Sequence, residues 1–112
     1  MPNQRTPADR IFHALADPTR RAVVERLSAG PAAVGELARR FDMALPSFTQ
    51  HLGVLEESGL VRSKKSGRVR TCYLVPTRLK AAESWLAKQR TIWEKRLDQL
   101  DDYLLQLKEN RK

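Results

Sequence analysis

The stretch "LPSFTQHLGVLEESGL", residues Leu45–Leu60, decides how the rest of the sequence is interpreted. Its apolar side chains recur at helical spacing, at Leu45, Phe48, Leu52 and Leu55. This spacing predicts a helix over about 45–58 that turns the apolar stripe into a core and ends at Gly59. The opposite face begins with small and polar side chains, and no acid comes before Glu56. Because a helix N-terminus carries free N–H groups and a partial positive charge, this helix is suited to enter a groove of DNA.

Three shorter helices are predicted upstream of this DNA-reading helix. The first covers about 8–16, and the second begins with Asp17 as its cap and Pro18 at the first helical position. The third covers about 33–41. Only the short turn Asp42–Ala44 separates it from the DNA-reading helix. That is the spacing of a helix-turn-helix.

After the DNA-reading helix the hydrophobic period becomes alternating. Two strand-like runs, "LVRSKK" (60–65) and "RVRTCYLV" (68–75), flank the turn dipeptide Ser66-Gly67, which predicts a β-hairpin. The cations of this hairpin are Arg62, Lys64, Lys65, Arg68 and Arg70. A helix-turn-helix followed by a basic hairpin indicates a winged helix, whose wing contacts phosphates or the minor groove. The alternative is an ordinary charged hairpin.

A long helix is predicted over about 77–107. Its apolar residues follow a step of seven, with intermediate positions filled, which is the pattern of a two-helix seam. A helix of about 30 residues is about 45 Å long, so a second copy is the simplest cover for its far half. The predicted dimer interface comprises Ile11, Phe12, Leu86, Trp93, Leu97, Leu100 and Leu104. The alternative is a helix that folds back on its own domain.

The predicted fold class is therefore mostly α with a small β-hairpin. It is a winged helix-turn-helix of order α-α-α-α-β-β-α that dimerises through the long C-terminal helix and the first helix. Residues 1–112 are expected to form a single winged-helix DNA-binding domain, with dimerisation helices at 8–16 and 77–107.

The charge balance favours a polyanionic partner. The 112 residues contain 21 Lys and Arg against 13 Asp and Glu, a net charge of +8, which is compatible with nucleic acid or an anionic membrane surface. No apolar run approaches the roughly 18–20 residues that span a bilayer, and residues 1–12 lack the apolar segment of a secretory signal. We expect a cytoplasmic protein whose partners are double-stranded DNA and a second copy of itself, and no membrane.

Three segments resemble the ArsR-type (arsenic-repressor-like) winged-helix transcriptional regulators. They are "FHALADPTRRAVVERL" (12–27), "VGELARRFDMALPSFTQHLGVLEESGLVRSKKSGRVRTCYL" (34–74) and "WLAKQRTIWEKRLDQLDDYL" (85–104). The resemblance implies a homodimeric repressor that binds an operator and often controls its own operon. Two positions depart from it: Ala44 stands where the family commonly has a Ser or Thr cap, and Gln50 where it often has Lys or Arg. Because Gln can bond adenine at two points, an altered sequence preference is expected.

The candidate DNA-binding residues on the reading helix are Ser47, Thr49, Gln50 and His51, and the hairpin cations join them. The first three are the expected base readers. His51 flanks the apolar stripe and either contacts DNA or bonds the backbone. The pairs Arg20–Arg21 and Arg39–Arg40 either touch phosphate or face only water.

Other kinds of site are not expected. Metal-sensing relatives carry Cys-x-Cys in the third helix, but "VGELARRF" (34–41) has no thiol and the long helix has no His, so no metal and no cofactor are predicted. Cys72 is expected to be a buried apolar group, with a redox role left open. No phosphate loop, nucleophile elbow or zinc-protease motif is present, so the protein is not expected to be an enzyme.

The sequence therefore predicts a homodimeric, sequence-specific DNA-binding transcriptional regulator, a repressor on a palindromic operator. Two alternatives stay open: a winged-helix sensor of an organic or redox signal, and a protein or RNA interaction module. The sequence does not identify the operator, the regulated genes or any effector.

Overall fold

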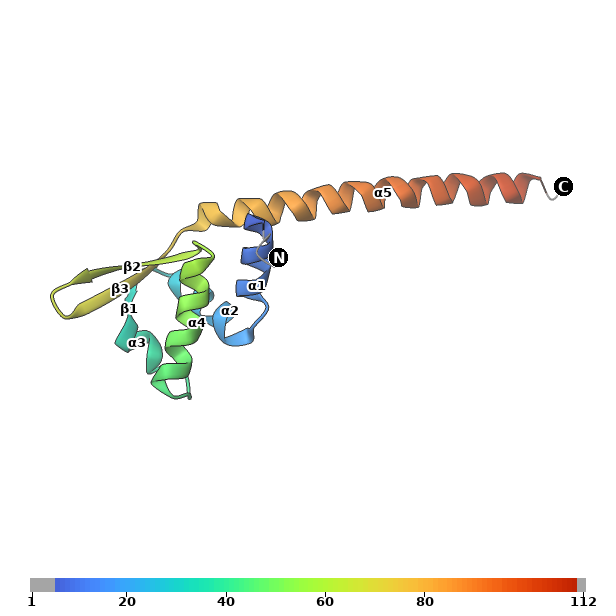
Figure 1. The fold of residues 1–112 in the computed structure, drawn as a ribbon. Coiled ribbons are helices and arrows are strands. Elements are labelled where there is room, and N and C mark those ends of the chain that lie inside the picture. The colour runs from blue at the N-terminus through green and yellow to red at the C-terminus, as the bar shows by residue number, and fades with distance from the viewer. Residues whose placement is uncertain (1–5, 111–112) are drawn as a thin grey trace, which may run out of the picture. The chain divides into compact units, whose positions relative to one another are not determined.

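The computed structural model describes residues 6–110, in two compact units divided between Ala82 and Glu83. The first unit contains α1 (Pro7–Leu15), α2 (Pro18–Leu27), β1 (Ala32–Ala33), α3 (Val34–Ala38), α4 (Leu45–Glu57), β2 (Val61–Ser66), β3 (Val69–Leu74) and the 3-10 helix η1 (Pro76–Leu79) (Figure 1). Helix α5 (Lys80–Glu109) begins in the first unit and continues as the second. That the two units work as one DNA-binding domain stays a prediction.

Local capping chemistry explains where the first two helices begin. The Thr6 hydroxyl accepts from the Asp9 backbone N–H, and the Asp9 carboxylate accepts from that of Thr6, a reciprocal capping box. Asp17 accepts from the backbone N–H of Arg20 at 3.1 Å, with Pro18 in the first turn of α2. The predicted start of the second helix is therefore confirmed.

Helix α3 is shorter than the predicted span 33–41. The backbone N–H groups of Arg40 and Phe41 bond to the carbonyls of Leu37 and Ala38, three residues back, at 3.0 and 3.2 Å. This tighter winding ends the α-helix at Ala38 and brings the chain into the short turn before α4.

The sheet has three strands in the order β1-β3-β2, one more than predicted. Ala32 and Ala33 of β1 pair with Cys72 and Thr71 of β3, antiparallel. Two alanines carry no alternation of polarity, so the sequence pattern could not reveal this strand.

The hairpin turn lies one residue later than predicted. Ser66 pairs with Val69, so the two turn residues are Gly67 and Arg68 rather than Ser66 and Gly67. Gly67 has φ +62°, a left-handed conformation that glycine adopts without steric cost.

The core confirms most of the predicted inner stripe of α4. Phe48 and Leu55 are fully buried and Leu52 is 5% exposed, packed with residues from α1, α2, α3 and the sheet. The prediction is wrong for Leu45, which is 59% exposed. Phe41 stacks on Phe48 with ring centroids 5.4 Å apart, so the core is covered at this end of α4 without Leu45.

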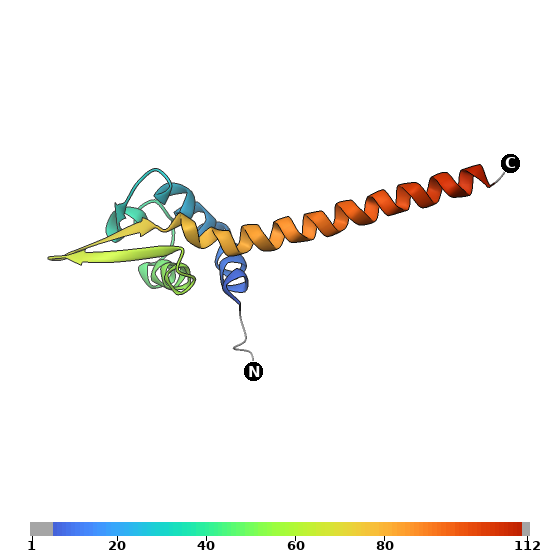
Figure 2. The same ribbon diagram turned by 90° about the horizontal axis from the view of Figure 1, so that it is seen from above.

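Strands β2 and β3 extend beyond the helices of the first unit as a wing, which Figures 1 and 2 both show. At its base the wing joins the core through Val61 and Cys72, both buried. Towards its turn every side chain from Lys64 to Arg70 is exposed. The hairpin is thus anchored at one end and free at the other.

The second unit is one continuous helical segment with apolar side chains in water. Its exposed large hydrophobic residues are Trp85, Leu86, Ile92, Trp93, Leu97, Leu100, Tyr103, Leu104, Leu105 and Leu107. Among the described residues, no helix is long and apolar enough to cross a membrane.

Candidate nucleic-acid interface

The N-terminal half of α4 presents the predicted base readers to solvent. Ser47, Thr49 and Gln50 are all exposed, while Phe48 between them is buried. The first turn contains no acid, and Ala44 at the N-cap makes no side-chain hydrogen bond. The free N–H groups of this turn are therefore available to an acceptor on a ligand.

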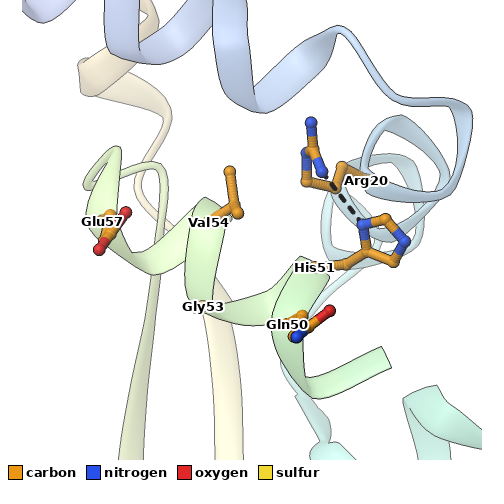
Figure 3. Close-up of a pocket in the computed structure, with 6 residues that line it drawn as sticks. All are labelled: Arg20, Gln50, His51, Gly53, Val54 and Glu57. Carbon is orange, nitrogen blue, oxygen red and sulfur yellow. Dashed lines mark hydrogen bonds between the residues drawn. The ribbon is translucent and has the colours of Figure 1, made fainter. Parts of the chain in front are cut away.

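His51 lies where the reading helix meets the start of α2. Its Nδ1 atom is 3.1 Å from Arg20 Nη1 and 3.7 Å from Asp17 Oδ2 (Figure 3). The ring is partly buried. The intramolecular partners of His51 are therefore side chains rather than the backbone that the sequence offered as an alternative.

Asp17 stays ionised in these surroundings. Desolvation raises the pKa of its carboxyl, but the backbone N–H of Arg20 and the neighbouring His51 and Arg20 side chains outweigh it, and the pKa lies below its usual value. The carboxylate keeps its cap on α2 and adds negative charge beside Arg20.

Side chains on α2 and α4 surround an open pocket of about 440 Å³. Its lining comprises Arg20, Gln50, His51, Gly53, Val54 and Glu57 (Figure 3). Gln50, a predicted base reader, and His51, for which the sequence left two roles open, thus line the same pocket. The acidic residue of the pocket, Glu57, lies seven residues after Gln50, towards the C-terminal end of α4.

The wing cations divide between two faces of the hairpin. Since side chains alternate along a strand, the cross-strand pairs Arg62–Tyr73 and Lys64–Thr71 lie on one face. The pairs Ser63–Cys72 and Lys65–Arg70 lie on the other. Arg68 occupies the turn. The sequence predicted the cations but not this division.

Lys65 and Arg70 face each other directly across the two strands. Like charges in this position destabilise a hairpin. A phosphate group bound between them would remove the repulsion, so the tip of the wing is arranged to gain from an anion.

Arg20 and Arg21 hold the end of α1. Arg20 donates from Nε to the Ala14 carbonyl at 2.7 Å and from Nη2 to the His13 carbonyl at 3.0 Å, and Arg21 donates from Nη1 to the Leu15 carbonyl at 2.8 Å. Arg20 is therefore partly buried, and Arg21, although exposed, also bonds the protein, so neither side chain contacts only water. The signal available in the sequence was the proximity of both to the end of the first helix.

Cys72 is fully buried. Burial raises the pKa of its thiol, the Glu56 carboxylate adds to the rise, and Arg70 opposes it. A thiol held in its protonated form is a poor nucleophile. Among residues 6–110, no three His, Cys, Asp or Glu side chains are grouped so that they could hold a metal ion.

The predicted interface residues of the long helix are all open to solvent. Leu86, Trp93, Leu97, Leu100 and Leu104 are each about half exposed or more. Ile11 differs, because it is 1% exposed and belongs to the core of the first unit. Its side chain has no surface left for a partner, so Ile11 is withdrawn from the predicted interface, while Phe12 keeps a partly exposed surface.

Known proteins share this arrangement. A helix-turn-helix domain family model matches residues 15–64. The HTH-type transcriptional regulator Rv2034 of Mycobacterium tuberculosis is 51% identical over 81 residues, 72% of this chain and 75% of that protein. The crystal structure of the ArsR family transcriptional regulator RHA00566 is 57% identical, with a TM-score of 0.75, over 80% of this chain and 98% of that one. The chain belongs to the ArsR family of transcriptional regulators.

The ArsR-family membership confirms the predicted winged helix-turn-helix fold and the resemblance drawn from the sequence. A more distant relative, the transcriptional repressor SdpR of Bacillus subtilis, is 29% identical over 76 residues, 68% of this chain and 84% of that protein. The residues around α3, α4 and the wing of this ArsR-family chain are therefore the natural candidates for its contact with DNA.

Proposed function

We propose that the protein is a homodimeric repressor that binds a palindromic operator in duplex DNA. The N-terminal half of α4 enters the major groove, with Ser47, Thr49 and Gln50 at base edges, and the wing cations contact phosphates or the minor groove. The observation that carries the proposal is the set of exposed polar side chains Ser47, Thr49 and Gln50 on the acid-free first half of α4, whose other face is buried through Phe48, Leu52 and Leu55.

Charge supports DNA as the partner. The chain carries a net charge of +8, and the opposed cations Lys65 and Arg70 at the wing tip leave a repulsion that phosphate would relieve. Gln50, in the middle of the exposed face, can make two hydrogen bonds with adenine.

A second copy of the chain is proposed to cover α5. Leu86, Trp93 and Leu100 repeat at seven-residue intervals, and all three are about half exposed or more. Apolar surface in water costs about 25 cal/mol per Å², so two such helices gain by packing together. The resulting two-fold axis would relate two reading helices about one DNA turn apart.

Repression rather than activation is the role proposed from the relatives, since SdpR is named a transcriptional repressor. No metal, cofactor or catalytic activity is part of the proposal. It places the protein in the cytoplasm with the DNA that it regulates, and the effector stays open.

The test is fluorescence anisotropy of the full chain with duplex DNA from its own upstream region and with a random duplex of the same length, over a series of salt concentrations. Tight binding to the upstream duplex, weaker binding to the random one and a steep fall of both with salt are expected. Equal affinity for the two duplexes would exclude a sequence-specific regulator of that region. An affinity insensitive to salt would favour the protein-interaction module.

A further inference from the structure

Arg20 is fixed at one end by the last turn of α1. Its Nε and Nη2 atoms donate to the carbonyls of Ala14 and His13 at 2.7 and 3.0 Å. Both carbonyls belong to the last turn of α1, where the C-cap N–H of Ala16 also donates to the His13 carbonyl at 3.2 Å. Two hydrogen bonds on one planar guanidinium hold both its position and its orientation.

The remaining terminal nitrogen of Arg20, Nη1, lies 3.1 Å from His51 Nδ1 (Figure 3). A guanidinium has only donors, so Nδ1 must be the acceptor in this pair. The Asp17 carboxylate is 3.7 Å from the same nitrogen, beyond hydrogen-bond distance. The contact with Arg20 therefore determines the tautomer, with the ring proton on Nε2.

Nε2 lies on the far side of the imidazole ring from the contact with Arg20 (Figure 3). His51 and Gln50 both line the open pocket of about 440 Å³. A neutral imidazole protonated at Nε2 offers a hydrogen-bond donor and no acceptor at this outer atom. It can bond guanine N7 or O6, adenine N7, thymine O4 or a phosphate oxygen, and it cannot accept from the amino groups of cytosine or adenine.

We propose that Arg20 is a positioning residue that fixes His51 as a hydrogen-bond donor, through Nε2, to an acceptor on duplex DNA. This inference rests on the proposed function, since it assigns His51 a part in the same reading surface. It links α1, α2 and the reading helix through one side chain. A base edge and a phosphate can both supply the hydrogen-bond acceptor, and the test distinguishes between them.

The first measurement needs no DNA. Long-range ¹H–¹⁵N spectra of the imidazole, recorded at mildly alkaline pH, should show Nδ1 bare and Nε2 protonated in the unaltered protein. Arg20→Gln should shift His51 towards a mixture of tautomers. Arg21→Gln is the matched control, because Arg21 donates to the Leu15 carbonyl at the end of α1 rather than to His51, and it should leave the tautomer unchanged. An unchanged His51 spectrum in Arg20→Gln would overturn the proposal.

The second measurement compares His51→Gln with His51→Asn, after thermal melts show that both are folded. The Gln amide can place a donor near the former Nε2, whereas the Asn amide reaches only the Nδ1 position. His51→Gln should bind the upstream duplex within about threefold of the unaltered protein, and His51→Asn about tenfold or more weakly. Equal affinities of the two variants would overturn the donor assignment.

The random duplex then identifies the acceptor. A loss in His51→Asn confined to the upstream duplex assigns a base edge, and an equal loss on both duplexes assigns a phosphate. Failure of the proposed function is recognised separately, because the unaltered protein would then not prefer the upstream duplex, while the spectra would still decide whether Arg20 sets the tautomer.

Discussion

Ala44 stands at the N-cap of α4 with no side chain that could accept from the first turn. The backbone there is extended, with φ −65° and ψ 145°, which is the conformation that a capping serine uses. The reading helix therefore begins with free N–H groups, which lowers its stability and leaves those groups open to a ligand.

Ala44→Ser should stabilise the free protein by about 1 kcal/mol, because the serine hydroxyl would satisfy one of these N–H groups. That corresponds to a rise in Tm of about 4–8 °C for a chain of this size. Thermal unfolding followed by circular dichroism measures it. Ala44→Val, which adds a side chain without an acceptor, is the control, and an equal effect of both variants would show that capping is not the cause.

Gln50→Ala tests base reading by a single exposed side chain. It should reduce the discrimination between the upstream and random duplexes by about 1–3 kcal/mol and leave binding to random DNA nearly unchanged. Competition binding with both duplexes measures the difference. Glu57→Gln is the control, because it removes the acidic group from the same pocket and leaves the expected base readers unchanged. If Gln50→Ala weakened both duplexes equally, Gln50 would not be a base reader.

At the residue scale, the sequence predicted which side chains are buried better than it predicted which side chains contact one another. The spacing of Phe48, Leu52 and Leu55 was enough to place them in the core. It also placed Leu45 there, because periodicity ignores that the first residue of a helix has no preceding turn beside it. The contact of Arg20 with His51 joins residues 31 positions apart in the sequence, and local sequence patterns do not predict contacts at such a separation.

Among the secondary-structure elements, the wing shows most clearly which features the sequence pattern predicts and which only the structure reveals. Alternating polarity predicted both of its strands, and the dipeptide containing Gly67 placed its turn to within one residue. The third strand, β1, was missed, since Ala32 and Ala33 become a strand only through their pairing with β3. The division of cations between two faces depends on register, which was not known until the turn was placed.

Lys65→Ala should have two effects because of the opposed pair at the wing tip. It should remove the repulsion from Arg70 in the free protein, and it should reduce the slope of log affinity against log salt by about 0.9 on every duplex. Anisotropy titrations over a salt series measure the slope. Lys64→Ala reports on the opposite face, and Lys88→Ala on α5 is the control that should leave the slope as it is. A slope unchanged by Lys65→Ala would remove this face of the wing from the interface.

For the whole molecule, the deciding feature is the apolar seam of α5. The sequence pattern predicted the helix and its seven-residue repeat, and the structure describes the helix over 30 residues. The seven-residue repeat and the exposed fractions both describe a single chain. The partner helix is therefore inferred from the apolar side chains of α5 that remain exposed.

Leu100→Asp should dissociate the proposed dimer, because it places a charge in the middle of the seam. Leu105→Asp is the matched control: Leu105 is also exposed, at 58%, but it lies about 140° around the helix from Leu100 and so outside the seam. Light scattering coupled to size-exclusion chromatography gives the mass of each. A dimer that persists in Leu100→Asp, or dissociates equally in both variants, would place the interface elsewhere.

Two paired reading helices leave a pattern on DNA that no single helix can produce. A nuclease footprint on the region upstream of the gene tests this directly. We predict two protected half-sites of inverted sequence, with centres about 10–10.5 base pairs apart or a multiple of that spacing. Protection of one isolated half-site, or a footprint no different from that on random DNA, would contradict a two-fold regulator with its reading helices in successive major grooves.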